Sequence, residues 1–133
     1  MTAKIIDGKA IARAVRVGIA ARAEALRRKG VQPALTVIVV GDNPASAVYV
    51  RNKVNACAEV GIKSEVVRFP AGTNEKEILD RIAVLNETAS VHGILVQLPL
   101  PQTISVRRIL ETISAAKDVD GFHLYNVGGL VIG

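Results

Sequence analysis

Helical and extended patterns of apolar residues alternate along the chain. In residues 9–29, apolar side chains recur at near-helical spacing with arginines between them, which predicts an amphipathic helix that Gly30 ends. The segment from Leu35 to Val40 is apolar except for Thr36, as is typical of a strand buried on both faces of a parallel sheet. The chain should therefore begin with a helix followed by a buried strand.

Turn and capping residues place the next two elements. Asn43 suits a helix N-cap and Pro44 suits the first helical position, so we expect a helix to start there. This helix should stop at Gly61, because glycine commonly follows the last helical turn. Residues 63–69 then predict a second strand.

The same order continues in the second half of the chain. Asn74, with Glu77 three residues later, resembles a capping box and predicts a third helix. The buried stripe of this helix comprises Ile78, Leu79, Ile82 and Leu85. Residues 93–98 predict an apolar strand interrupted by one amide, and residues 99–101 a loop. A short helix follows, with Ile109, Leu110 and Ile113 on its apolar face, and then a turn at 117–121.

This order of elements predicts an α/β domain with a three-layer, open, mostly parallel sheet and helices on both faces. At 133 residues, the chain is expected to form one domain, residues 1–133. Ligands of such sheets bind beyond the carboxyl ends of the strands, where the loops begin. Three segments should meet there, namely residues 41–49, 97–101 and, less directly, 118–126.

Composition and charge narrow the function. The chain carries a net charge of +5, and only 3% of its residues are aromatic. The charge is uneven, since residues 1–29 carry +6 and the remainder −1. A basic first helix could bind nucleic acid or an anionic tail, but a solvated helix face is the favoured interpretation. The scarcity of aromatic rings also disfavours base stacking, so no nucleic-acid partner is expected.

The sequence also bears on the compartment. No segment is long and apolar enough to cross a membrane, and the first residues lack the pattern of a signal peptide. The single cysteine, Cys57, excludes an internal disulfide framework. We therefore expect a cytoplasmic protein with no membrane partner.

Candidate chemistry lies at the expected binding edge. Tyr49 and Lys53 are four residues apart on one predicted helix and so share a face, although such pairs usually decorate a surface. Gln97 ends an apolar strand and must find hydrogen-bond partners or cost about 1–3 kcal/mol, which fits a structural role as well as a functional one.

Asp118 and Asp120 belong to an Asp-x-Asp-Gly string. Aspartate and glycine are both common in turns, so a turn is the favoured interpretation. The string also resembles part of a calcium loop, but the remaining ligands at the required spacing are missing. No metal site is therefore expected.

Four segments in combination resemble one enzyme family. They are Val40-Gly-Asp-Asn-Pro-Ala-Ser46, Tyr49-x-x-x-Lys53, Gly93-Ile-Leu-Val-Gln-Leu-Pro-Leu-Pro101 and Lys117-Asp-Val-Asp-Gly-Phe-His-x-Tyr-Asn-Val-Gly128. Together they resemble the N-terminal catalytic domain of the bifunctional methylenetetrahydrofolate dehydrogenase/cyclohydrolase family. The resemblance covers the whole chain in order, and the string ILVQLPLP is highly specific.

The resemblance implies an enzyme of one-carbon folate metabolism, which feeds purine biosynthesis. The full enzyme would oxidise 5,10-methylenetetrahydrofolate with NADP and hydrolyse the methenyl product to 10-formyltetrahydrofolate, as a homodimer. Lys53 matches the family's catalytic lysine, which acts in proton transfer and on the attacking water. Gln97 matches the residue that holds this lysine.

The same resemblance implies the substrate contacts. Tyr49 matches a catalytic-site residue that packs along the folate, and Asp120 matches the carboxylate that hydrogen-bonds the pterin ring. A carboxylate suits the pterin because its ring edge presents neighbouring N–H donors. Leu98 and Pro99 match further substrate-binding positions.

The chain departs from the family pattern at Leu124, which is often proline, and at Gly129, which is usually arginine. The dinucleotide-binding domain of the family would follow Gly133. We therefore expect no NADP-binding residue in this chain, and we expect an isolated domain or fragment that is monomeric or weakly self-associating.

Two other functions remain open at this point. A truncated relative without catalysis could still bind folate or dimerise, and the basic first helix could serve a small nucleic-acid-binding domain. Salt-dependent binding to any duplex would favour the second, whereas saturable, salt-resistant folate binding would disfavour it.

Overall fold

A computed structural model describes residues 3–133 of the chain. The elements in order are α1 (Gly8–Arg28), β1 (Ala34–Val40), α2 (Pro44–Glu59), β2 (Lys63–Phe69), α3 (Glu75–Glu87), β3 (Gly93–Val96), α4 (Val106–Thr112) and α5 (Leu124–Ile132). The predicted helices and strands are confirmed within a few residues. Helix α5 was not predicted, and β3 ends at Val96, two residues earlier than expected.

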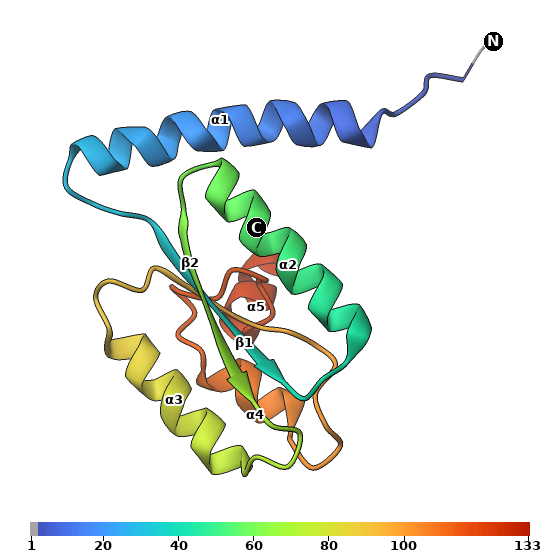
Figure 1. Cartoon of the computed structure of the whole chain (residues 1–133), viewed down its shortest axis with the longest axis vertical. Helices are drawn as coiled ribbons and strands as arrows, with labels where there is room; N and C mark the ends of the chain where they lie inside the picture. The colour runs from blue at the N-terminus through green and yellow to red at the C-terminus, as the bar shows by residue number, and fades with distance from the viewer. Residues whose placement is uncertain (1–2) are drawn as a thin grey trace.

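The three strands form one parallel sheet in the order β2-β1-β3. An isolated parallel bridge between Ile94 and Asp118 brings the segment before α5 alongside β3. Helix α2 covers one face of the sheet, and α3 and α4 cover the other (Figure 1). The predicted three-layer, open α/β architecture is therefore confirmed.

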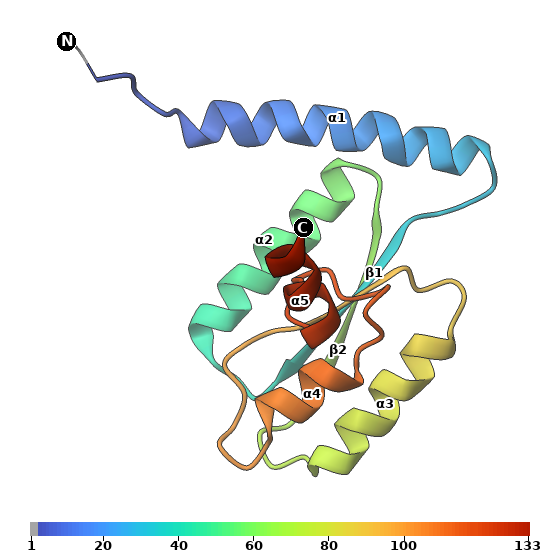
Figure 2. The ribbon, with the colours of Figure 1, turned by 180° about the vertical axis from the view of Figure 1, so that it is seen from behind.

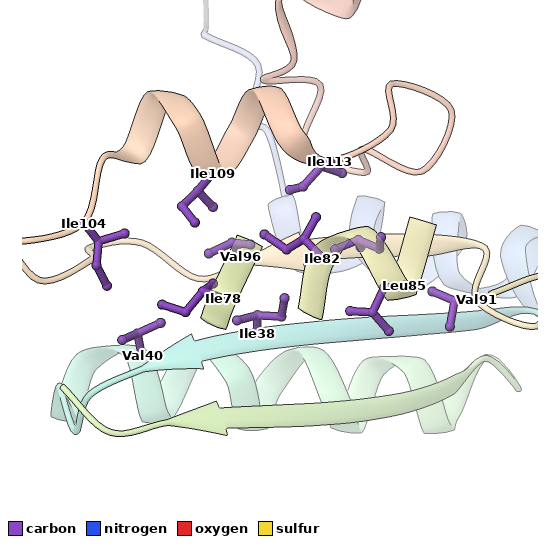
Figure 3. Close-up of a cluster of buried hydrophobic side chains, with 11 residues drawn as sticks. Ile38, Val40, Ile78, Ile82, Leu85, Val91, Val96, Ile104, Ile109 and Ile113 are labelled. Atoms are coloured by element: carbon purple, nitrogen blue, oxygen red, sulfur yellow. The ribbon is translucent and has the colours of Figure 1, made fainter. Parts of the chain in front are cut away.

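The hydrophobic core lies in two layers, one on each face of β1. Alternate side chains of β1 serve both layers, since Ile38 and Val40 point to one and Val37 and Val39 to the other. Figure 3 shows the larger layer, in which α3 and α4 close over β1 and β3. The fully buried isoleucines are Ile38, Ile78, Ile82, Ile94 and Ile109. This packing explains why β1 and β3 are nearly continuous apolar segments.

Asparagine side chains cap two of the helices. Asn43 accepts hydrogen bonds from the backbone N–H groups of Ala45 and Ser46 at the start of α2. Asn74 caps α3, but its side chain accepts from the backbone N–H of Lys76 and not from that of Glu77, so the predicted residue caps the helix without the bonds of a capping box. Both helices nevertheless begin where the capping residues predicted.

The two terminal helices differ from the core. Helix α1 extends beyond the rest of the molecule (Figure 1), and Ile11 and Val15 on its apolar stripe are 53% and 55% exposed. Only Ala23, in its C-terminal half, is buried. Helix α5, seen best in Figure 2, buries no residue at all. The amphipathic pattern of α1 is thus real, but most of its apolar face has no cover within residues 3–133.

Ion pairs partly neutralise the basic charge of α1. Arg16 pairs with Glu59 at 3.3 Å, while Arg27 and Arg28 pair with Glu24 at 2.5 and 3.2 Å. These contacts support the interpretation of a solvated helix face. Among the residues that the structure describes, no helix is long and apolar enough to span a membrane.

Candidate active site

Helix α2 presents Tyr49 and Lys53 at the predicted binding edge. The helix is anchored by Ser46 and Val50, which are 4% and 1% exposed on its inner face. Lys53 is half-buried, whereas Tyr49 is 61% exposed. A tyrosine ring held outward on a rigid helix offers a flat apolar surface with a polar tip, which suits contact with a planar ligand.

Lys53 and Gln97 meet across 44 residues of sequence. The Nζ atom of Lys53 donates a hydrogen bond of 2.9 Å to Oε1 of Gln97. The Gln97 amide group is fixed in turn, because its Nε2 donates to the carbonyl of Leu98 at 2.8 Å. Its backbone N–H donates to Ile38 and extends the ladder between β1 and β3. The strand end therefore presents Oε1 toward the lysine, as the demand of Gln97 for partners predicted.

Asp118 and Asp120 lie two residues apart but have opposite environments. The Asp118 carboxylate accepts hydrogen bonds from the backbone of Gly121 at 3.1 Å and His123 at 2.9 Å, and from Nδ2 of Asn126 at 2.9 Å. Partial burial alone would raise the pKa of Asp118, but these hydrogen bonds hold it below its ordinary value. Asp118 is therefore the turn-forming residue of the pair.

The Asp120 carboxyl group is within range of the charge of Lys53 instead. Desolvation raises the pKa of this carboxyl group, the charge of Lys53 opposes the rise, and the charge of Asp118 adds to it. Within residues 3–133, the Asp120 side chain makes no hydrogen bond of its own. This exposed carboxylate is therefore available to accept hydrogen bonds from a ligand, within range of the charge of Lys53.

Leu98 and Pro99 follow directly after Gln97. Leu98 is half-buried and Pro99 is exposed, and the peptide bond between them is cis. Through the Gln97 hydrogen bond, the Leu98 carbonyl belongs to the same polar network as Lys53. The structure thus groups Tyr49, Lys53, Gln97 and Asp120, with Leu98 and Pro99 on the adjoining loop.

Two residues of this region were given no role by the sequence. Asn126 donates from Nδ2 both to Asp118 and to the Ala115 carbonyl. Lys117 caps the end of α3, because its Nζ donates to the carbonyls of Leu85 and Thr88, both at 2.9 Å. An asparagine five residues after an Asp-Gly turn is a weak signal on its own, and the partners of Lys117 are distant in sequence.

The remaining candidates do not add a metal centre. Among residues 3–133 no group of three or more His, Cys, Asp or Glu side chains could hold a metal ion. His123 caps α5, with Nδ1 accepting from the backbone of Tyr125. Cys57 is half-buried, and desolvation raises the pKa of its thiol, which disfavours a reactive thiolate.

This arrangement combines a cation, an amide, a free carboxylate and an exposed aromatic ring. A planar ligand with neighbouring N–H donors could stack on Tyr49 and donate to Asp120. Its reacting atom would then lie near the amino group of Lys53, which Gln97 holds in place. The group is chemically suited to proton transfer on a ligand that the ring and carboxylate orient.

Comparison with known proteins identifies what the chain is similar to. The family model described as "Tetrahydrofolate dehydrogenase/cyclohydrolase, catalytic domain" matches residues 6–120. A curated relative, the bifunctional protein FolD of Nitrosospira multiformis, is 57% identical over all 133 residues, which make up 46% of that protein. The chain thus spans about half the length of the curated relatives it matches.

Solved structures agree with these matches. The FolD methylenetetrahydrofolate dehydrogenase/cyclohydrolase of Campylobacter jejuni is 48% identical with a TM-score of 0.93, over 95% of this chain and 45% of that one. The methylenetetrahydrofolate dehydrogenase-cyclohydrolase of Trypanosoma brucei, complexed with NADP cofactor and inhibitor, is 36% identical with a TM-score of 0.92. That match covers 99% of this chain and 46% of the other.

Proposed function

Because this chain belongs to the tetrahydrofolate dehydrogenase/cyclohydrolase family, we propose that it is the folate-binding catalytic half of a bifunctional enzyme. The enzyme oxidises 5,10-methylenetetrahydrofolate to the methenyl form with NADP and hydrolyses that product to 10-formyltetrahydrofolate. The observation that carries this proposal is the hydrogen bond from Lys53 to Gln97 at the carboxyl end of β3. The carboxylate of Asp120, which makes no hydrogen bond within the described residues, is within range of the charge of this lysine.

Lys53 acts in proton transfer during hydrolysis. Water adds to the methenyl carbon, so a proton must leave that water and one must later reach the departing nitrogen. A cationic group placed beside an ammonium favours loss of its proton, so binding of the methenyl substrate would prepare Lys53 to accept a proton. Gln97 keeps the amino group aimed at the reacting carbon through the 2.9 Å hydrogen bond.

The other residues hold the substrate. Asp120 accepts hydrogen bonds from the N–H edge of the pterin, and the exposed ring of Tyr49 packs along the folate. Leu98 and Pro99 contribute the adjoining apolar surface. Their position next to Gln97 supports this assignment, because the carbonyl of Leu98 already belongs to the network around the lysine.

The pyrophosphate of NADP does not fit the first strand-to-helix turn of this chain. The turn from β1 into α2 has one glycine, Gly41, before Asn43 and Pro44, whereas a pyrophosphate-binding turn needs several glycines for close backbone approach. We therefore assign NADP binding to the part of the longer protein that lies outside these 133 residues. The residues described above serve the folate and the hydrolysis step.

We also place the enzyme in the cytoplasm, as a homodimer in its full length, supplying formyl groups for purine biosynthesis. The lone cysteine supports the compartment. The exposed apolar faces of α1 and α5 support further contacts in the full-length protein. Sedimentation of the full-length protein at micromolar concentration would test the dimer, and a monomer would contradict it.

The activity itself is tested with purified full-length protein and methenyltetrahydrofolate. We expect hydrolysis well above the spontaneous rate and, with NADP present, oxidation of the methylene substrate. A protein that binds folate saturably but accelerates neither reaction would instead be a non-catalytic binding module. Failure to bind folate at all would contradict the proposal outright.

A further inference from the structure

The turn between Lys117 and α5 is held by an unusually complete set of hydrogen bonds. Asp118 accepts from the backbone N–H groups of Gly121 and His123 and from the side chain of Asn126. We call Asp118, Asn126 and these backbone groups the Asp118 clasp.

The clasp is anchored to the sheet. The backbone of Ile94 in β3 donates to the carbonyl of Lys117 at 2.8 Å, and Asn126 donates to the carbonyl of Ala115. Val119 packs so closely on Gly93 that a Cβ atom at Gly93 would come within 2.6 Å of its side chain. The turn therefore has little freedom to shift relative to β3, which also carries the chain to Gln97.

Asp120 lies inside the turn that the clasp closes. Its neighbours on either side, Val119 and Gly121, are fixed by packing on Gly93 and by the hydrogen bond to Asp118. Its own carboxylate has no hydrogen bond within the described part of the chain, and the charge of Lys53 attracts it. The backbone of the turn therefore sets the place from which this side chain reaches toward a ligand.

We propose that Asp118 and Asn126 are positioning residues, which hold the Asp120 carboxylate in place for the folate. This inference rests on the proposed folate site and adds two residues that act through Asp120 rather than on the substrate. A preorganised acceptor binds its ligand more tightly because it does not lose conformational freedom on binding. Loosening the clasp should therefore cost affinity, while the Lys53–Gln97 pair stays intact.

A double-mutant cycle in the full-length protein tests this directly. The variants are Asp118→Asn, Asn126→Ala and Asp120→Ala, alone and combined, with folate affinity as the measurement and the exposed Asp80→Asn as a control for charge. We expect Asp118→Asn and Asn126→Ala each to weaken affinity about tenfold. In the Asp120→Ala background, the same changes should have almost no further effect.

Three results would overturn the proposal. The first is a double variant whose loss of affinity equals the product of the two single losses, and the second is unchanged affinity in both Asp118→Asn and Asn126→Ala. The third is a loss of saturated hydrolysis rate as large as the loss of affinity, since it would indicate general damage and not positioning. Asn126→Ala keeps every charge, so it covers the case in which Asp118→Asn does not fold.

A ligand-free readout separates this proposal from the proposed function. The carboxyl of Asp120 is titrated by NMR in the wild type and in Asn126→Ala, with Lys53 and Asp118 as the charged groups that face it. We expect the pKa of Asp120 to differ between the two proteins, because the loosened turn changes its exposure to water and its distance from Lys53 and Asp118. An unchanged titration would overturn the clasp, whereas wild-type protein that binds no folate would contradict only the proposed function.

Discussion

The candidate site has two sides that are held in place by different forces. Tyr49 and Lys53 stand on α2, which is fixed by apolar packing of Val50 against the sheet. Asp120 stands on a turn with no helix or strand of its own, which is fixed by the hydrogen bonds of Asp118. The helix side therefore tolerates changes in its outer residues, while the turn side depends on a few polar atoms.

In the proposed function, this difference corresponds to two separate roles, proton transfer on the α2 side and pterin binding on the side of the turn. Proton transfer needs an amino group whose position survives substrate exchange, and a packed helix with a 2.9 Å hydrogen bond to Gln97 provides it. Pterin binding needs an acceptor that is free in the absence of ligand, and a carboxylate on a clasped turn provides that. The helix side should thus set the rate, and the turn side should set the affinity.

The largest effect is expected at Lys53. In the full-length protein, Lys53→Met should reduce methenyltetrahydrofolate hydrolysis by about 10²–10⁴, the usual contribution of a general acid–base group. The fold should be unaffected, because the side chain is half-buried at the edge and contributes little to the core. Initial-rate assays with Lys76→Met, an exposed lysine on α3, as the matched control would measure this loss.

Asp120→Ala should act on affinity. One charged hydrogen bond is lost, which is worth about 1.5–3 kcal/mol and corresponds to a roughly tenfold to 150-fold rise in Kd for folate. Equilibrium binding by fluorescence or calorimetry would measure it. An unchanged Kd would show that Asp120 does not bind folate, and the turn would then have no role in the proposed site.

Gln97→Ala should resemble a milder form of the lysine variant. The amide holds the amino group but does not exchange the proton, so we expect a loss of hydrolysis rate of about tenfold, the factor for one released hydrogen bond. Gln97→Met, which keeps the bulk and removes the acceptor, should behave alike. If Gln97→Met kept the wild-type rate, the effect of alanine would come from lost volume.

The smallest expected effect is on stability, and it differs in sign between Asp118 and Asp120 because their pKa values shift in opposite directions on folding. The pKa of Asp118 is lowered on folding, so its ionised form stabilises the protein above its ordinary value of 3.8, and this stability is lost as pH falls through the folded value. The pKa of Asp120 is raised, so its protonated form favours the fold at low pH, and that gain is lost as pH rises through the folded value.

The two asparagine variants should therefore change stability in opposite directions. At pH 7, Asp118→Asn should lower the free energy of unfolding and Asp120→Asn should raise it. Solvent screening limits the electrostatic part to less than about 1 kcal/mol for each. Urea unfolding at pH 7 would measure both, and equal signs would show that the two carboxylates do not differ as described.

The helix side of the site was predictable from the sequence, and the turn side only in part. The apolar strands, the N-cap at Asn43 and the proline at the first helical position predicted α2 correctly, because local patterns and burial agree there. The turn at Asp118 was predicted, but the contact with Asn126 and the support from Lys117 depend on tertiary geometry. The family resemblance named Asp120, whereas no local pattern separates it from Asp118.

The sequence pattern also did not predict that the apolar faces of α1 and α5 are exposed. The stripe of Ile11 and Val15 reads like any core-facing helix, yet these side chains are half exposed. Periodicity reports that a helix has an apolar face, but not whether the partner of that face lies within the same stretch of chain. Helix α5 was missed because Gly128 and Gly129 have low helix propensity.

The division of labour between the two sides is tested most directly by the hydrolysis rate at saturating methenyltetrahydrofolate, measured in single turnovers for the wild type, Lys53→Met and Asp120→Ala. Saturation removes the effect of affinity and leaves the chemical step. We predict that Lys53→Met remains at least about 100-fold slower than the wild type, while Asp120→Ala recovers to within about threefold because it retains Lys53 and Gln97. A Lys53→Met rate within about threefold of the wild type, or an Asp120→Ala loss as large as that of Lys53→Met, would contradict the assignment of rate to the α2 side and affinity to the turn side.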